Sequence, residues 1–393
     1  MKVYLKEAME WLFPDKISQV NSGLESPVFD APRGGIVSVA AVVNGLNDGD
    51  RIAVAADNSD VCVFEMLDVC VNRNTSEHGF AERAGVEKSH SVIRNAPFRE
   101  YDALKPLDGD VISRNGVAAL LVQIPIKYNA VPGETKYTIS FSAGKEIKEV
   151  CFSVRVSSVK IPKTGKNSVY FTNWFSLENF ALYAKTEFWT PRFWDAVKEQ
   201  AEMMFHARQN TFILPLKPFF EYKDGNYTLN SRRMKKFIDI FTEAGLYWIE
   251  GGHFGSRNGG WTAPDFKVMC SDHSVRSMEG NRDIAQIARQ LKAFMDKYDL
   301  KKRWIQHVTD EPILENADSY RIFTELIRKY LPGIPILDAM SDPEIAGACD
   351  IWCPQVQLYQ RRKNDFDATR EQGDHIWAYT CCMPGGIWLN RLC

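Results

Sequence analysis

Two adjacent carboxylates, Asp310 and Glu311, are the residues of this 393-residue chain best placed to do chemistry. They come directly after Trp304–Thr309, an apolar stretch that predicts a buried strand, and directly before Pro312. Side chains alternate between the faces of a strand and the pleat relaxes where the strand ends, so both acids can reach one site. The proline restricts Glu311 to extended backbone angles and disfavours a helix there. The pattern predicts an acid pair at the carboxyl end of a strand, where barrel enzymes carry their catalytic groups.

The chain around this pair divides into two parts with different sequence patterns. In residues 1–160, short segments rich in Val, Ile and Phe alternate with turn-forming residues, which predicts an N-terminal antiparallel β-sandwich. No catalytic constellation is evident in this part. The expected strands are Ile36–Val43, Arg51–Ala56, Val61–Val71, Gly116–Ile126, Thr135–Ser142 and Lys148–Val159.

Residues 167–393, which follow a short linker, predict a catalytic (β/α)8-type TIM barrel. Apolar strand-like segments alternate there with helical patterns, as in parallel βαβ units, and no Gly-x-Gly-x-x-Gly loop favours a dinucleotide-binding sheet. A closed barrel of this class needs eight strands. We count seven, so we expect a fragment truncated at the C-terminus that lacks the last strand, because Met383–Cys393 is too short to supply it. The seven are Val169–Phe175, Thr211–Leu216, Leu246–Gly251, Arg303–Thr309, Ile334–Ala339, Ile351–Gln357 and His375–Thr380.

Polar and aromatic side chains follow these expected strands and would face one cavity in a barrel. Carboxylates, amides and aromatic rings in this mixture suit a polyhydroxylated ligand. A structural role is the alternative for some of them: core packing for Tyr379, a hydrogen-bonded structural role for His253, and a loop cap for Asp338. The candidates for substrate binding are Asn173, Trp174, His253, Asp338, Gln355, Gln357, Tyr359 and Tyr379.

The segment from His253 to Gly280 is a long polar loop that contains Trp261. Long loops in compact domains are usually functional or disordered, and an exposed tryptophan is costly. We expect this loop to form a lid or the wall of a subsite.

Charge and apolar patterning exclude some partners. Lys+Arg 48 against Asp+Glu 50 gives a net charge of −2 without any block of like charge, so no nucleic-acid partner is expected. No stretch approaches the ~18 apolar residues of a membrane span. The acidic N-terminal segment does not resemble a signal peptide, which predicts a cytoplasmic protein, or a secreted one whose leader was removed.

Metal and cofactor chemistry are not expected from the sequence. The nine cysteines lack metal-ligand spacing and fit free thiols in a reducing compartment. No His-x-His motif follows the first expected strand of the second part. We therefore expect neither a metal nor any other cofactor.

Three segments are the most specific in the second part of the chain: His307–Pro312, with Asp350–Gln355 and Trp377–Cys381 in support. On these residues the sequence resembles glycoside hydrolase family 123. The resemblance implies a β-N-acetylgalactosaminidase with an N-terminal β-sandwich and a catalytic barrel. Family 20 hexosaminidases share the Asp-Glu pair, so the pair alone does not distinguish GalNAc from GlcNAc.

By the family's pattern, Glu311 would be the general acid and then the base for water, and Asp310 would orient the 2-acetamido group of the substrate. The acetamido oxygen would be the nucleophile, which is an exception to the usual two-carboxylate scheme. The acid meets the glycosidic oxygen on C1 and the second carboxylate meets the N–H on C2, so neighbouring carboxylates serve neighbouring atoms. Tyr359 or Tyr379 would donate to the acetamido oxygen.

Two other functions stay open at this point. A conventional retaining glycosidase would pair Glu311 with Glu250 or Asp338 as the nucleophile. In a non-catalytic carbohydrate-binding protein the sandwich would bind the carbohydrate and the barrel would be degenerate. The expected partner in every case is a glycan or glycoconjugate, and no oligomeric state is predicted.

Overall fold

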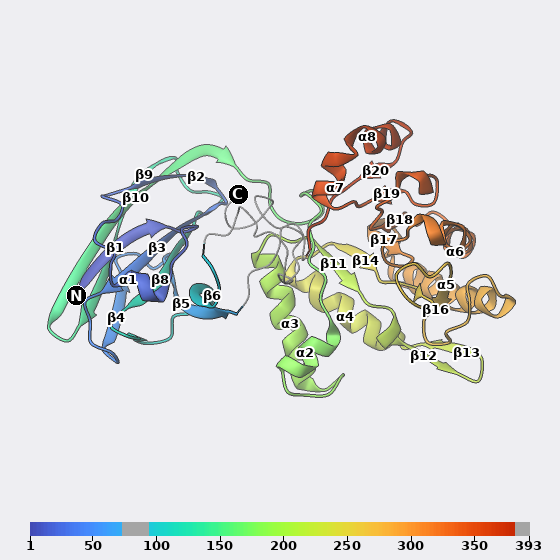
Figure 1. The fold of residues 1–393 in the computed structure, drawn as a ribbon, viewed down its shortest axis with the longest axis horizontal. Helices are drawn as coiled ribbons and strands as arrows, with labels where there is room; N and C mark the ends of the chain where they lie inside the picture. The colour runs from blue at the N-terminus through green and yellow to red at the C-terminus, as the bar shows by residue number, and fades with distance from the viewer. Residues whose placement is uncertain (73–93, 382–393) are drawn as a thin grey trace. The chain divides into compact units, whose positions relative to one another are not determined.

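The computed structural model describes residues 1–72 and 94–381. The described chain divides into two compact units, Met1–Pro162 and Lys163–Cys381, each with its own core (Figure 1).

The first unit is built from two five-stranded sheets and one short helix, α1 (Pro14–Ile17). One sheet has the order β1 (Lys2–Glu7), β3 (Ile36–Asn44), β8 (Ala118–Pro125), β5 (Cys62–Val71) and β6 (Phe98–Pro106). The other has the order β2 (Val28–Arg33), β10 (Glu146–Lys160), β9 (Gly133–Ala143), β4 (Arg51–Ala56) and β7 (Val111–Ile112).

The two sheets share one buried core, as in a sandwich. Val39 and Val122 from the first sheet cluster with Phe141 and Val154 from the second. All six strands expected in this part are present, and β1, β2, β6 and β7 are additional. The expectation of a wholly antiparallel sandwich is wrong in one respect, because β2 pairs with β10 in parallel.

The second unit contains a six-stranded sheet in which every neighbouring pair is parallel. Its order is β11 (Thr211–Leu214), β14 (Trp248–Gly251), β17 (Trp304–His307), β18 (Ile336–Asp338), β19 (Ile351–Trp352) and β20 (His375–Ile376). Two hairpins accompany the sheet, β12 (Phe220–Lys223) with β13 (Asn226–Leu229) and β15 (Gly255–Arg257) with β16 (Phe266–Val268). The helices are α2 (Leu177–Tyr183), α3 (Pro191–His206), α4 (Ser231–Ala244), α5 (Met278–Tyr298), α6 (Ala317–Tyr330), α7 (Val356–Arg361) and α8 (Lys363–Glu371).

Helix boundaries follow local capping. The hydroxyl of Thr190 accepts the backbone N–H of Phe193 and Pro191 occupies the first position of α3. Helix α4 ends at Gly245, whose φ of 111° favours glycine.

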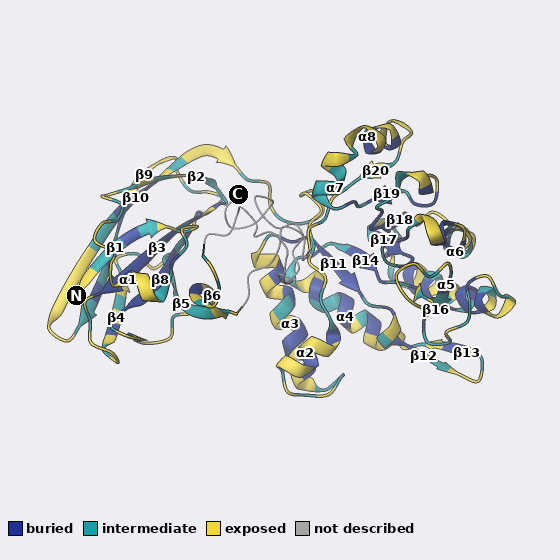
Figure 2. Ribbon diagram, viewed as in Figure 1, coloured by how far each residue is buried: buried dark blue, intermediate teal, exposed yellow. Residues whose placement is uncertain are grey.

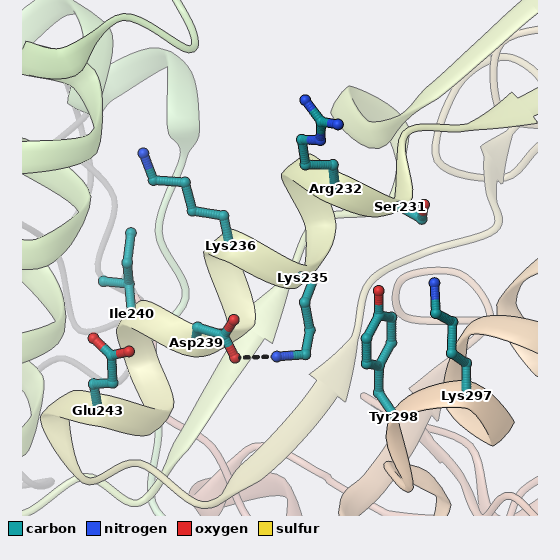
Figure 3. A pocket seen from close by; sticks show the side chains of 9 residues that line it. All are labelled: Ser231, Arg232, Lys235, Lys236, Asp239, Ile240, Glu243, Lys297 and Tyr298. Atoms are coloured by element: carbon teal, nitrogen blue, oxygen red, sulfur yellow. Dashed lines mark hydrogen bonds and ion pairs between the residues drawn. The ribbon is translucent and has the colours of Figure 1, made fainter.

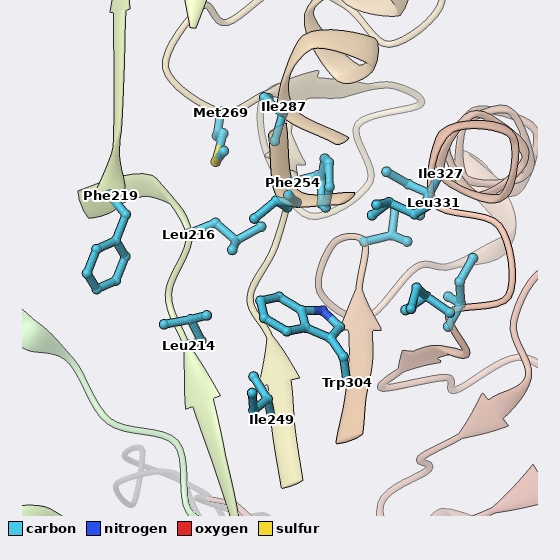
Figure 4. Close-up of a cluster of buried hydrophobic side chains, with 14 of the residues drawn as sticks. Leu214, Leu216, Phe219, Ile249, Phe254, Met269, Ile287, Trp304, Ile327 and Leu331 are labelled. Atoms are coloured by element: carbon cyan, nitrogen blue, oxygen red, sulfur yellow. The ribbon is translucent and has the colours of Figure 1, made fainter. Parts of the chain in front are cut away.

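Alternation along the strands separates a helix-facing side from an inner side of the sheet. Ile249 and Trp304 pack with α5 and α6 in the large core of Figure 4, whereas Ile305 packs with Leu337 and Ile351 in a separate cluster. Figure 2 shows the same strands as buried and the outer faces of the helices as exposed. Polar side chains on the inner side, at the carboxyl ends of the strands, are therefore the ones that can meet a ligand.

The expected strand Val169–Phe175 is not a strand. The backbone N–H of Phe171 binds the side chain of Asn210 at 3.0 Å, and that of Asn173 binds the side chain of Gln209 at 3.0 Å, so side chains take the place of a strand ladder.

The strand expected at Ile351–Gln357 is also shorter, because it ends before Pro354, which has no N–H to donate, and α7 begins at Val356. The described sheet thus has six of the seven expected strands.

The two edges of the described sheet come together through aromatic side chains. Tyr170, before β11, stacks on Trp377, after β20, with ring centroids 4.7 Å apart. This contact requires a sheet curved toward closure, as in a barrel. A closed eight-stranded barrel stays a prediction, and Met383–Cys393, on which the count of strands depends, lies outside the described residues.

Candidate active site

The acid pair lies in the bend that follows β17, at the carboxyl end of the sheet. Glu311 has a φ of 46°, in the left-handed region. A guanidinium nitrogen of Arg257 donates to the backbone carbonyl of Glu311 and helps to hold this conformation. The extended backbone predicted for Glu311 from Pro312 is therefore wrong, because a tertiary contact decides the conformation.

A buried charged cluster spans the ends of three neighbouring strands. Glu250 in β14 and His307 in β17 are each 2% exposed, and Asp338 in β18 is 0% exposed. Nε2 of His307 lies 2.8 Å from Oε1 of Glu250, and its Nδ1 lies 3.8 Å from Oδ1 of Asp338. Burial opposes a charge on the imidazole, but Asp338 and Glu250 raise the pKa of His307 to about 10. At neutral pH His307 is a cation that neutralises part of the charge of both carboxylates.

Both of these carboxylates have further partners. Oε1 of Glu250 also accepts the indole N–H of Trp174 at 2.8 Å. Asp338 accepts the hydroxyl of Tyr320 at 2.9 Å and the backbone N–H of Ala339 at 3.0 Å. Neither acid is available as a free group on the surface of the site.

Three rings pack edge to face beside this cluster. The centroids of Trp174, His253 and His307 are 5.2–5.4 Å apart, and Trp174 is 46% exposed. Burial and the charge of His307 lower the pKa of His253 to about 4, so His253 is neutral at neutral pH. The site thus has a fixed, exposed indole next to a neutral imidazole.

The surroundings of Asp310 shift its ionisation. Burial, the carboxylate of Asp338 and the carboxylate of Glu311 raise the pKa of Asp310 to about 6. Within residues 1–72 and 94–381 the Asp310 carboxylate accepts no hydrogen bond. A donor from a ligand would therefore find its lone pairs available.

Tyr379 connects the last described strand to the acid pair. Its hydroxyl donates to Oε1 of Glu311. Burial and the contact with Glu311 raise the pKa of Tyr379 far above its usual range, so its phenol remains a donor. Gln355 forms a parallel bridge with Tyr379, which fixes the position of this segment.

The expected binding residues separate into two groups. Tyr359 is not brought to the pair, because its hydroxyl donates to Asp367 at 3.1 Å and accepts from Arg370 at 3.3 Å, both on α8. The side chains of Asn173 and Gln357 make no hydrogen bond to the pair within the described chain. Asp338 and Tyr379 interact with the pair itself, and Gln355 lies beside Tyr379. Trp174 and His253 contact His307 of the buried charged cluster.

Two contributors were not among the expected site residues. His307 could have been found, because a histidine on the inner side of an apolar strand needs a charged or hydrogen-bonding partner. Arg257 lies in a polar loop without periodicity, and its approach to Glu311 depends on the β15–β16 hairpin, which the sequence did not predict.

A separate surface depression of about 630 Å³ lies between α4 and the end of α5 and contains none of these residues (Figure 3). Its lining includes Lys235 and Asp239, which pair with each other at 2.5 Å. Among the residues that the structure describes, no group of three or more His, Cys, Asp or Glu side chains is arranged to hold a metal. No helix in the same residues is long and apolar enough to cross a bilayer.

Solved structures with a similar fold include a family 123 glycoside hydrolase from Clostridium perfringens, described for glycolipid glycan hydrolysis. It matches with a TM-score of 0.73 and 12% identity over 100% of this chain and 73% of that one. A family 20 exo-β-N-acetylglucosaminidase from Vibrio harveyi has a TM-score of 0.30 and 9% identity, covering 96% of this chain and 81% of its own. A β-D-glucuronidase of Dictyoglomus thermophilum has a TM-score of 0.34 and 10% identity, covering 86% and 74%. The last two scores are below the level that indicates a common fold.

No functionally curated protein matches the chain. The model of the glycoside hydrolase 123 catalytic domain, however, matches residues 174–393. That match spans the strands and loops of the acid pair, the charged cluster and Tyr379, and it covers 220 of 393 residues. The chain therefore belongs to glycoside hydrolase family 123 and is a glycosidase.

Proposed function

We propose that this glycosidase removes β-linked N-acetylhexosamine, with GalNAc favoured, by substrate-assisted catalysis with retention at the anomeric carbon. The preference for GalNAc rests on the family. The mechanism rests on which carboxylates of the site are available.

One observation carries the mechanism. A conventional retaining enzyme would need a second carboxylate about 5–5.5 Å from the acid as a free nucleophile. The two candidates, Glu250 and Asp338, are buried and already bound to His307, Trp174 and Tyr320. Of the four carboxylates compared in the described chain, the adjacent pair of Asp310 and Glu311 is left to act on the substrate, which favours a nucleophile supplied by the substrate itself.

The pair then divides the work between neighbouring atoms of the sugar. Glu311 gives its proton to the glycosidic oxygen as the bond to C1 breaks, while the acetamido oxygen bonds to C1 and forms an oxazolinium ion. Asp310 accepts the acetamido N–H, aligns the oxygen and stabilises the positive charge. In the second half of the reaction, Glu311 takes a proton from water as the water oxygen attacks C1. The bond from C1 to the acetamido oxygen breaks, which opens the oxazolinium ring and restores the acetamido group.

The tyrosine that serves the acetamido oxygen is Tyr379 in this proposal. Its hydroxyl already contacts Glu311, whereas Tyr359 is bound to α8. Trp174 provides a flat apolar face for the sugar ring, and neutral His253 provides a polar contact beside it.

Inhibition by a thiazoline tests the proposal. A GalNAc-derived thiazoline mimics the oxazolinium ion, so we expect competitive inhibition with a Ki far below the KM of the substrate. The corresponding compound without the fused thiazoline ring is the control. Inhibition no stronger than that by free GalNAc would contradict substrate assistance.

The pH dependence of kcat/KM is a further prediction. Asp310 must be a carboxylate to accept the N–H and to stabilise the cation, and its pKa is about 6 in the free protein. Below that pH a growing fraction is protonated, so kcat/KM should fall about tenfold per pH unit on the acidic side. A profile that stays flat down to about pH 4.5, measured within the stability range of the protein, would contradict this role.

A further inference from the structure

The β15–β16 hairpin carries an exposed tryptophan close to the catalytic pair. Its register pairs Gly255 with Val268 and Arg257 with Phe266, and Trp261 lies in the intervening turn. The side chain of Trp261 is 55% exposed. Ligand sites are lined mainly by apolar and aromatic side chains with a few polar groups, so an exposed indole linked to the catalytic pair is a candidate ligand contact.

Arg257 joins this ring to the catalytic acid. Its guanidinium lies 4.0 Å from the ring centroid of Trp261, a cation–π contact. The same guanidinium donates to the backbone carbonyl of Glu311, and its charge acts on Asp310. Trp261, Arg257 and Glu311 are therefore consecutive members of one set of contacts.

The turn of the hairpin is fastened to the segment that follows Glu311. The backbone carbonyl of Ala263 accepts the side chain of Asn316 at 3.2 Å. The carboxylate of Asp265 accepts the hydroxyl of Ser319 at 2.6 Å. Asn316 directly precedes α6 and Ser319 lies in its first turn, so both donors come a few residues after the acid. Of the two roles expected for this loop, these contacts favour a fixed wall over a mobile lid.

We propose that Trp261 binds the leaving group, the sugar on the other side of the scissile bond. The inference rests on the proposed function of Glu311 as general acid. The oxygen that Glu311 protonates is the first atom of the leaving group. Arg257 is bound to the backbone of Glu311 and Trp261 packs on its guanidinium, so the indole is within reach of that group. The apolar CH face of a pyranose fits the indole face.

The second exposed indole belongs to the other side of the bond. Trp174 donates a hydrogen bond to Glu250 and packs against His307. Glu250 and His307 belong to the buried cluster whose charges shift the pKa of Asp310. Asp310 holds the acetamido group of the N-acetylhexosamine itself. The two tryptophans thus divide the substrate between them, Trp174 for the sugar that is cleaved off and Trp261 for the sugar that is released.

Two substrates that differ only in the leaving group test the assignment. A disaccharide of GalNAc β-linked to galactose has a sugar as its leaving group. The leaving group of β-N-acetylgalactosaminyl fluoride is a fluoride ion, which cannot stack on an indole. We expect Trp261→Ala to lower kcat/KM for the disaccharide by about 10- to 100-fold and to leave the fluoride unchanged. Trp261→Phe should recover part of the loss.

Two further variants complete the design. Tyr183→Ala removes an aromatic ring that is 76% exposed on α2, and should change neither substrate. Arg257→Ala should impair both substrates, because it also loses the contact with Glu311. With the fluoride as donor, added galactose should give disaccharide product in the wild type and far less in Trp261→Ala.

Equal losses on both substrates, or none on either, would overturn the assignment of Trp261 alone. If the wild type hydrolysed neither of the two substrates, the proposed function would be overturned, and the inference with it.

Discussion

Replacing Glu311 by Gln is expected to lower kcat/KM by about 10²–10⁴-fold for substrates with a sugar leaving group, the usual contribution of general acid–base catalysis. The amide keeps the shape of the carboxyl group and can still accept from Tyr379, but it cannot give a proton to the departing oxygen. A para-nitrophenyl leaving group needs little protonation, so its release should be slowed much less. The dependence on the leaving group identifies the acid, because a merely structural loss would lower both rates alike.

Glu315→Gln is the matched control, since Glu315 is an exposed acid in the short helical turn Leu314–Asn316 just beyond the pair. It should behave like the wild type. Wild-type rates in Glu311→Gln itself, on the sugar leaving group, would refute the assignment.

Replacing Asp310 by Asn should slow substrates with good and with poor leaving groups alike, by a similar factor of about 10²–10⁴. The reason is that the intermediate forms in the same step that releases either leaving group, and its positive charge loses the facing carboxylate. Asp318→Asn, an exposed acid at the start of α6, is the control. If Asp310→Asn slowed only the hydrolysis of substrates with poor leaving groups, the roles of the two acids would have to be exchanged.

The same Asp310→Asn variant should be more stable than the wild type at neutral pH. The folded-state pKa of Asp310 is raised from 3.8 to about 6, so above pH 6 its charge destabilises the fold, and this cost disappears when the group is protonated. Each pKa unit corresponds to about 1.4 kcal/mol. Partial exposure of Asp310 reduces the free energy that this pKa shift represents. We expect the free energy of unfolding in urea to be higher in the variant by on the order of 2 kcal/mol at about pH 8, and the difference to vanish below about pH 4. A loss of both stability and activity would point to a structural role instead.

The sequence predicted the site best where chemistry and strand position coincide. The pair Asp310 and Glu311 follows a strand whose limits are plain from its apolar residues, and the structure places the pair after β17. Glu250 and Asp338, at the ends of neighbouring strands, were anticipated as alternative nucleophiles. Their pairing with His307 was not, because contacts between strands distant in the sequence depend on register.

Predictions failed where tertiary contacts override local preference. The segment from Val169 to Phe175 has strand-forming residues, yet Asn210 and Gln209 take its backbone N–H groups. Tyr359 was assigned to the site on the assumption of a strand to Gln357, but α7 turns it toward α8. The role of Arg257 depends on a hairpin of three-residue strands, too short to give a periodic signal.

The most direct test of substrate assistance compares two substrates that differ only at C2. One is the para-nitrophenyl glycoside of β-N-acetylgalactosamine, and the other is the para-nitrophenyl glycoside of β-galactose, which lacks the acetamido group. If the substrate supplies the nucleophile, kcat/KM should be at least about 1,000-fold lower for the galactoside, because a well-oriented internal nucleophile is lost and no protein carboxylate replaces it. Equal turnover of the two substrates would contradict the mechanism, since the nucleophile would then have to come from the protein.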